Sequence, residues 1–271
     1  MKSITARDNP TLKALRALAG DTREQRASGQ TLIEGPHLLT ACLDHGHELD
    51  LLVVSESAVV APEVADLLRR AAGVPTLCLR DALFRELSEL ATPVGILARI
   101  PIPAAPAGLP AGDCLLLDAV QDAGNVGTLL RTAAAAGVRD VLLGGGCAGA
   151  WAPRVLRGAQ GAHFGLQIRE QVDLQDFLRG YSGVSVATVA HQGESIYAID
   201  LKHPVAWLFG NEGSGIAPEL VAATRQHATI PLAPGSESLN VGAAAAICLF
   251  EMRRQRASLT MQKVGAGGTA P

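Results

Sequence analysis

The stretch AWLFGNEGSGI, residues 206–216, joins an apolar run to a loop that contains three glycines and one carboxylate. Four more runs in the second half of the chain are apolar throughout, at residues 114–118, 140–144, 184–190 and 228–232. Uniformly apolar strands are typical of a parallel sheet that helices cover on both faces. The pattern predicts an α/β fold, and the glycine loop follows a strand, where such sheets bind ligands.

The chain of 271 residues is long enough for two domains. Residues 100–112 contain four prolines and no charge, which predicts an extended linker. Residues 1–99 alternate between short helices and strands and carry no catalytic constellation, so they are expected to form a small α/β recognition domain. Residues 113–257 form the second domain, and residues 258–271 lose periodicity and are expected to be a disordered tail. The elements expected in the first domain are helices at 10–19, 36–43, 62–72 and 81–90 and strands at 31–33 and 51–54, with TLCL (76–79) between the last two helices and VGILARI (94–100) closing the unit.

Composition limits the classes of protein. No run reaches the ~18 apolar residues that a membrane span needs, and the first residues lack the apolar segment of a secretory signal, so a cytoplasmic protein is expected. The five cysteines are scattered, without a CxxC pair or a Cys/His cluster at zinc spacing. The sequence therefore predicts no metal site.

Charge is unevenly distributed, although the net charge is only −3. Residues 1–26 carry six Lys or Arg against three acids, and residues 131–169 carry five arginines and one acid. Clusters of Lys and Arg in a chain whose net charge is negative are suited to binding a polyanion at one face of the protein. Ordinary solvated helix faces would explain the same charges equally well.

The first loop whose residues could take part in binding or catalysis leads into a helix within residues 121–138. An apolar stripe is predicted to be buried, and Gly137 is predicted to end the helix. The stripe consists of Val126, Leu129, Leu130 and Ala133. Asn125 and Arg131 lie on the other side, where a helix N-terminus offers donors to an anion. The alternative is that Asn125 is a simple N-cap and Arg131 an ordinary surface residue.

The second loop is the glycine-rich stretch. Its glycines permit a ligand or another backbone to approach closely, which a side chain would prevent. Glu212 either accepts hydrogen bonds from nearby amides or faces a ligand. Ser214 lacks the spacing of a nucleophile elbow, and the chain contains no P-loop motif.

The third loop lies within residues 230–256. Ser238 or Asn240 is expected to cap a helix, and the all-small segment 242–246 would let a partner helix or a threaded chain pack closely. The helix has one apolar face, formed by Leu239, Ala243, Ala246, Ile247 and Phe250.

Together the three loops resemble the motifs of the SpoU (TrmH-like) family of RNA 2′-O-ribose methyltransferases, of the SPOUT class. The matching segments are residues 125–133, 210–215 and 230–251, and the stretches LIEGPHLL and TPVGILA are similar to the substrate-binding domain that these enzymes often carry. The family often has proline where Ala123 stands and serine where Gly242 stands.

The resemblance implies an S-adenosylmethionine site in a deep trefoil knot, an RNA substrate, an obligate homodimer and no metal. The positions that match cofactor-binding residues are Gly210, Ile230 and Leu239, with Thr188, Ala190 and Gly144 nearby. The positions that match catalytic or substrate-facing residues are Asn125, Arg131, Glu212, Ser238 and Asn240. In this reading Arg131 acts on the ribose 2′-hydroxyl, and Glu212 orients Arg131 or Asn125.

The separate front domain favours ribosomal RNA over transfer RNA as the substrate. A transfer-RNA enzyme and a non-catalytic RNA-binding protein of the same fold remain as alternatives. A nicotinamide-dependent dehydrogenase, suggested by LLGGG at 142–146, lacks the GxGxxG that should follow a first strand.

Overall fold

The computed structural model describes residues 1–266, with side chains described up to residue 257. The chain forms two compact units. The first consists of residues 1–104 together with 149–164, and the second consists of residues 105–148 together with the chain from residue 165 onward.

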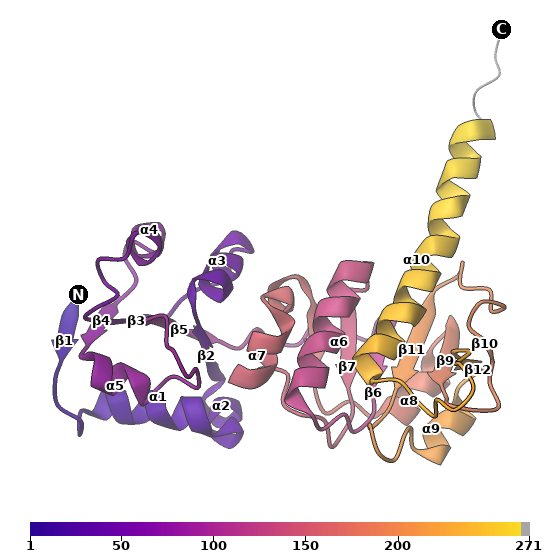
Figure 1. Ribbon diagram of the computed structural model, residues 1–271, viewed down its shortest axis with the longest axis horizontal. Coiled ribbons are helices and arrows are strands. Elements are labelled where there is room, and N and C mark those ends of the chain that lie inside the picture. The colour runs from indigo at the N-terminus through magenta and orange to yellow at the C-terminus, as the bar shows by residue number, and fades with distance from the viewer. Residues whose placement is uncertain (267–271) are drawn as a thin grey trace, which may run out of the picture. The chain divides into compact units, whose positions relative to one another are not determined.

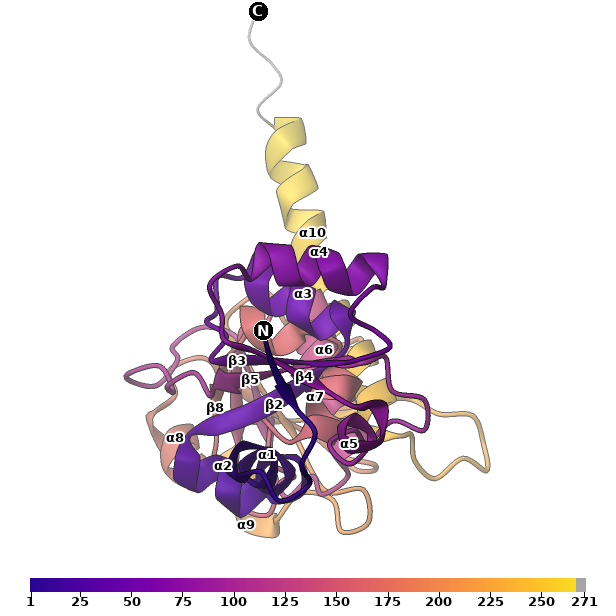
Figure 2. The ribbon, with the colours of Figure 1, turned by 90° about the vertical axis from the view of Figure 1, so that its left-hand side faces the viewer.

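The first unit is built on a five-stranded mixed sheet. Its order is β1-β4-β3-β5-β2, in which β1, β4 and β3 are parallel and β5 runs antiparallel to both β3 and β2. Figure 2 shows α3 and α4 on one face of this sheet and α1 and α2 on the other. The strands are β1 Lys2–Ile4, β2 Gln30–Glu34, β3 Leu51–Ser55, β4 Thr76–Leu79 and β5 Ile96–Pro101. The helices of residues 1–104 are α1 Pro10–Gly20, α2 Thr22–Ser28, α3 Pro36–Asp44, α4 Pro62–Arg70 and α5 Asp81–Arg85.

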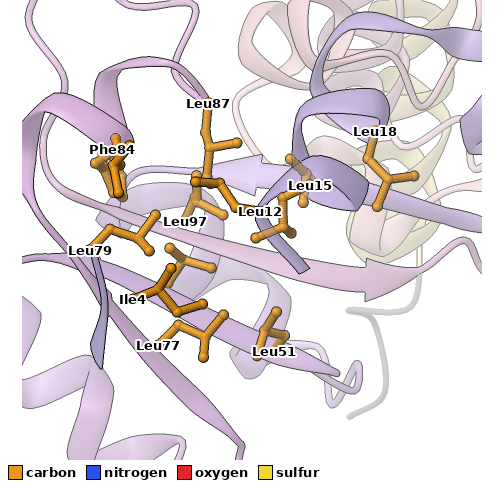
Figure 3. Packing of buried hydrophobic residues seen from close by; sticks show 13 residues of the cluster. Ile4, Leu12, Leu15, Leu18, Leu51, Leu77, Leu79, Phe84, Leu87 and Leu97 are labelled. Atoms are coloured by element: carbon orange, nitrogen blue, oxygen red, sulfur yellow. The ribbon is translucent and has the colours of Figure 1, made fainter. Parts of the chain in front are cut away.

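A leucine-rich core holds α1 against the sheet. Leu12, Leu15 and Leu18 recur every three residues on one face of α1, and all three are buried. Figure 3 shows them directed toward Leu97 and the surrounding strands. Full burial of one leucine contributes about 1.5–3 kcal/mol, so this face fixes the position of α1.

Residues 149–164 come from the second half of the sequence but belong to the first unit. They contain α7 Pro153–Ala159 and most of the short 3-10 helix η1 Ala162–Gly165. The buried Thr31 hydroxyl of β2 donates to the Trp151 carbonyl over 2.8 Å. Gly161 lies so close to α3 that an added Cβ would come within 2.7 Å of the Ala41 Cβ. The boundaries expected from the sequence did not include this excursion.

The second unit is built on a seven-stranded sheet in the order β10-β12-β9-β11-β6-β7-β8. Every neighbouring pair is parallel, which confirms the parallel α/β fold predicted from the apolar runs. The strands are β6 Cys114–Leu117, β7 Asp140–Leu143, β8 Gln167–Arg169, β9 Val184–Thr188, β10 Glu194–Ser195, β11 Val205–Phe209 and β12 Gln226–Thr229. The helices are α6 Ala123–Ala136, α8 Leu174–Gly180, α9 Pro218–Ala223 and α10 Val241–Ala266.

Helices cover the sheet of the second unit. Leucine and aromatic side chains of α8, together with Leu220 of α9, form a buried cluster with the central strands β6, β7, β9 and β11. In Figure 1, α10 runs beside α6, and the two helices are in contact. The predicted stripe of α6 is fully buried, and Gly137 ends the helix with a φ of 86°, as expected.

Three elements differ from the expectations. The helix expected at 81–90 ends at Arg85, because the Ser88 hydroxyl bonds the Glu34 carboxylate and accepts from the Leu90 amide in a turn. The last strand is Gln226–Thr229, so the chain has left the sheet by Ile230. The helix α10 continues to Ala266 through part of the expected tail, and residues 267–271 of that expectation lie outside the described residues.

Candidate active site

The loops that follow β9, β11 and β12 enclose one cavity of about 660 Å³ in the second unit. This volume lies within the range of roughly 300–1,000 Å³ that is typical of small-molecule sites. Its lining comes from three segments, residues 188–190, 209–216 and 228–244, and includes Thr188, Ala190, Gly210, Ile230, Ser238 and Leu239. The glycine-rich loop therefore forms one wall, and the segment that enters α10 forms another.

The glycine-rich loop is a tight reversal. The amide of Asn211 donates to the Gly215 carbonyl and the amide of Gly215 donates to the Asn211 carbonyl, both over 2.9 Å. At Gly210 an added Cβ would lie 2.4 Å from the carbonyl carbon and oxygen of Gly215, closer than a real Cβ approaches such atoms. Gly210 is therefore required for the loop to close on itself, which is the close backbone approach expected from the sequence.

Three side chains from the three predicted loops form a hydrogen-bonded chain. The Asn125 side-chain amide donates to the Glu212 carboxylate over 2.7 Å, and the Asn240 side-chain amide donates to the Asn125 Oδ1 over 2.9 Å. Asn125 thus uses both halves of its side chain. Glu212 and Asn240 also line the cavity, so the chain lies at its edge.

The ends of two helices hold this chain of side chains. Asp122 caps α6 by accepting from the Asn125 amide over 2.8 Å. The alternative in which Asn125 is a simple N-cap is wrong, because Asp122 fills that place and leaves the Asn125 side chain free for Glu212. At α10, Asn240 is the cap and accepts from the Gly242 amide over 2.9 Å.

Two of the expected site residues lie elsewhere. Gly144 is buried and does not line the cavity; its amide donates to the Leu117 carbonyl, and an added Cβ would lie 2.9 Å from the Leu174 side chain. Arg131 is exposed on α6 and does not line the cavity of its own chain. Within residues 1–257 its guanidinium makes no hydrogen bond or ion pair.

Some residues of the site were not predicted. Asp118, directly after β6, accepts a hydrogen bond of 2.8 Å from the Ala217 amide behind the glycine-rich loop. Ile216 and Leu232 add apolar surface to the cavity. The position of Asp118 at the carboxyl end of a parallel strand was a signal that could have drawn attention to it.

The electrostatics of the cavity are one-sided. Among the side chains described up to residue 257, Glu212 and Glu237 are the charged ones in its lining, and no Lys or Arg joins them. Farther along α10, Glu251 is buried and accepts two hydrogen bonds of 2.8 Å from Arg254, which hold the pKa of this carboxyl below its usual range. Glu251 is thus a charge held by Arg254 within the helix, and it is not among the residues that line the cavity.

The apolar face expected on the last helix is only partly covered by its own chain, with Ala246 and Ile247 half-buried. Phe250 is 46% exposed and Leu239 is 40% exposed, and Ala243 of the same face is also exposed. Among the described side chains of α10, the buried ones are instead those of Ala245, Cys248, Leu249, Glu251 and Met252, and Gly242 is buried as well. One apolar face of α10 is therefore partly open, at Ala243 and Phe250.

The described residues offer neither a metal site nor a membrane-spanning helix. No group of three or more His, Cys, Asp or Glu side chains is placed to hold a metal ion there. Over the same part of the chain, no helix has both the length and the apolar character needed to span a bilayer.

The second unit is thus a parallel α/β domain with a glycine-walled cavity at the carboxyl ends of its strands and three hydrogen-bonded side chains, of Asn125, Glu212 and Asn240, at the edge of that cavity. The chain belongs to the SpoU rRNA methylase family, whose model matches residues 114–250. A second model, the MRM3-like substrate binding domain, matches residues 9–98. Both matches confirm the resemblance drawn from the three loops and from the front domain.

Relatives match along nearly the whole chain. A Synechocystis protein named uncharacterized tRNA/rRNA methyltransferase is 34% identical over 94% of this chain and 94% of its own length. The 23S rRNA (guanosine(2553)-2′-O)-methyltransferase RlmP of Bacillus subtilis is 35% identical over 93% of this chain and 100% of its own. The crystal structure of an AdoMet-bound rRNA methyltransferase from Sinorhizobium meliloti is 30% identical and superposes with a TM-score of 0.82, covering 93% of this chain and 97% of that one.

Proposed function

We propose that this protein transfers a methyl group from S-adenosylmethionine to a ribose 2′-hydroxyl of ribosomal RNA. The observation that carries the proposal is the hydrogen-bonded chain of Asn240, Asn125 and Glu212 at the edge of a cavity with a backbone-lined wall. The family to which the chain belongs and its similarity to 2′-O-methyltransferases support the proposal.

The cavity fits S-adenosylmethionine in size and in charge. Its volume of about 660 Å³ suits a nucleoside-sized ligand, and the bare backbone around Gly210 allows close approach. When bound, this donor supplies an electrophilic methyl group on a positively charged sulfur. The carboxylates of Glu212 and Glu237, with no cation in the lining, provide a complementary negative field. Gly210, Ile230, Leu239, Thr188 and Ala190 would form the walls of this site.

The hydrogen-bonded side chains of Asn240, Asn125 and Glu212 would orient the ribose that accepts the methyl group. Asn125 is held by Glu212 on one side and Asn240 on the other, so its orientation is fixed before the RNA arrives. The donor held in the cavity would supply its methyl group to the ribose 2′-oxygen and leave as the neutral thioether, and the hydroxyl proton would pass to a basic group or to water. Ser238 and Asn240 lie at the cavity as candidates to contact the ribose.

Ribosomal RNA is the substrate class that the observations favour. The first unit matches the model of a substrate-binding domain, and a relative of nearly equal length methylates 23S rRNA according to its name. Such an enzyme would act in the cytoplasm. Transfer RNA is the alternative, supported by the mixed tRNA/rRNA designation of the Synechocystis relative.

We propose further that two copies of the chain complete one site. Arg131 is exposed and lies outside the cavity of its own chain, and the partly open apolar face of α10 offers a surface for a second copy. A second copy would let Arg131 of one chain act at the cavity of the other. The trefoil knot is also part of the proposal, supported by the two segments, 209–216 and 230–241, that line the same cavity.

The proposal is tested by incubating the protein with radiolabelled S-adenosylmethionine and, separately, with unmodified ribosomal RNA and transfer RNA. Label in ribosomal RNA alone supports it, whereas label in transfer RNA alone selects the alternative.

Light scattering tests the dimer: the native protein should have twice the mass of one chain, and Phe250→Glu should shift it toward the monomer. A native protein that is monomeric at micromolar concentration would contradict the dimer.

A further inference from the structure

Asn211 lies between the two halves of the candidate site. It follows Gly210 at the end of β11, next to the turn 118–120 at the end of the neighbouring strand β6. Its Nδ2 donates to the Ala119 carbonyl over 2.9 Å. Its Oδ1 accepts from the amides of Gly213 and Ser214, over 2.8 and 3.0 Å. The side chain is therefore bonded at both of its ends.

The turn that receives Asn211 is itself constrained. Ala119 has a φ of 51°, a left-handed backbone conformation that costs a non-glycine residue roughly 1 kcal/mol. Hydrogen bonds on either side hold it: the Asp118 carboxylate accepts from the Ala217 amide, and the Val120 carbonyl accepts from the Ala148 amide. The Asn211 side chain adds the bond to Ala119 itself.

Both partners of the catalytic hydrogen bond depend on this connection. Glu212 stands between Asn211 and Gly213, so the two bonds of the Asn211 side chain fix the backbone that carries its carboxylate. The turn 118–120 leads within two residues to Asp122, which caps α6 and bonds the Asn125 amide. The hydrogen bond from the Asn211 side chain to the Ala119 carbonyl therefore connects the two backbone segments that carry Glu212 and Asn125. We expect it to help fix the distance of 2.7 Å between Asn125 Nδ2 and the Glu212 carboxylate.

We propose that Asn211 is a positioning residue for methyl transfer. It fixes Glu212 relative to Asn125 through its bond to Ala119, and both of its polar ends are occupied by protein groups. This assignment rests on the proposed function, because it gives Asn211 a role in that same reaction. Its loss should reduce the rate of transfer through the Asn125 and Glu212 pair rather than by unfolding the loop.

Two variants separate the two ends of the side chain. Asn211→Asp keeps an oxygen for the amides of Gly213 and Ser214 but removes the donor to Ala119, whereas Asn211→Ala removes both. Asn211→Asp should lower kcat about tenfold, the size expected from loss of one hydrogen bond in a preorganised site, and Asn211→Ala should lower it at least as much. In protein without cofactor, the side-chain amide signal of Asn125 in a nitrogen-15 NMR spectrum should shift in both variants.

A double-mutant cycle with Glu212→Gln distinguishes positioning from general stabilisation. If Asn211 acts through Glu212, adding Asn211→Asp to Glu212→Gln should change kcat by less than about twofold. A full tenfold loss in that background, native-like kcat in Asn211→Asp, or an unmoved Asn125 signal would each overturn the assignment. Native protein that transfers no methyl group to any RNA would overturn the proposed function and this assignment with it, and the first three results would leave the proposed function standing.

Discussion

Asn240, the N-cap of α10, donates a side-chain hydrogen bond of 2.9 Å to Asn125 in the first turn of α6, 115 residues away in the chain. The same Asn240 caps α10 through its Oδ1. One residue therefore has a structural task and a task in the site, and the two can be separated by substitution.

Asn240→Asp should impair transfer without destabilising the protein. Aspartate is as good an N-cap as asparagine, so the free energy of unfolding should change by less than about 0.5 kcal/mol. The amide donor to Asn125 is lost, and a carboxylate faces the Asn125 oxygen, so kcat should fall by about 100-fold. Asn240→Ala is the comparison: it should also lose about 1 kcal/mol of stability with the cap. Native-like kcat in Asn240→Asp would show that this hydrogen bond does not serve the reaction.

Substitution by alanine should weaken binding of the cofactor at one glycine of the glycine-rich loop and leave it nearly unchanged at another. At Gly210 the new Cβ would lie 2.4 Å from Gly215 backbone atoms, whereas at Gly213 the nearest atom is the Asn211 Oδ1 at 3.5 Å, an ordinary contact. Gly210→Ala should weaken S-adenosylmethionine binding about tenfold or more, because strain of 1–3 kcal/mol falls on a wall of the cavity. Gly213→Ala should bind within about threefold of the native protein. Isothermal titration calorimetry measures both, and equal affinities would contradict the proposed role of this wall.

The residue at position 242 is coupled to Thr128. An added Cβ at Gly242 would lie 2.7 Å from the Thr128 Cγ2, and the Thr128 hydroxyl is engaged with the Gly124 carbonyl, which resists rotation of the side chain. Gly242→Ser, which introduces the residue common in the family, should cost about 1–3 kcal/mol of stability. In a Thr128→Ala background the same change should cost less than about 0.5 kcal/mol. Urea unfolding measures each step, and equal costs in both backgrounds would show that Thr128 is not the obstacle.

Much of the second unit was predictable because its signals are local. Buried parallel strands are apolar throughout, so four of the five expected runs match observed strands within two residues at each end. The run at 228–232 was misplaced because Ile230 and Leu232 are apolar for a different reason: they line the cavity. A short apolar run does not distinguish a strand from a ligand wall.

The contacts of the site were less predictable because they are long-range. The sequence motifs named Asn125, Glu212 and Asn240, but the order in which they bond follows from strand β6 lying beside β11. The same register places Asn211 beside Ala119, whose left-handed backbone no sequence motif announced. The packing of residues 149–164 in the first unit likewise depends on tertiary contacts such as that of Trp151 with Thr31.

Acid should destabilise the first unit through His163. This side chain is 1% exposed, donates from Nε2 to the Ala150 carbonyl over 2.6 Å, and has no hydrogen-bond partner at Nδ1 among the described residues. Burial lowers the pKa of His163 from 6.5 to about 4. Between pH 6.5 and about 4, His163 is protonated in the unfolded chain but neutral in the folded unit. The free energy of unfolding of this unit is therefore unaffected by His163 above pH 6.5, and it decreases as the pH falls toward 4.

The loss attributable to His163 over that window should be about 3 kcal/mol. Hydrogen–deuterium exchange of the β2 and β5 amides at several pH values measures it. His163→Gln, which keeps an amide donor and does not titrate, should show a shallower decrease over the same range. Identical pH profiles for the native protein and this variant would show that another group is responsible.

The central claim is that the cavity presents a methyl donor to a ribose hydroxyl. The most direct test is mass spectrometry of the nucleosides released from unmodified ribosomal RNA after incubation with the protein and S-adenosylmethionine carrying a deuterated methyl group. The account predicts the label in a single 2′-O-methylated nucleoside, and no label with Glu212→Gln beyond about one hundredth of the native amount. A labelled base, or native yield from the Glu212→Gln protein, would contradict it.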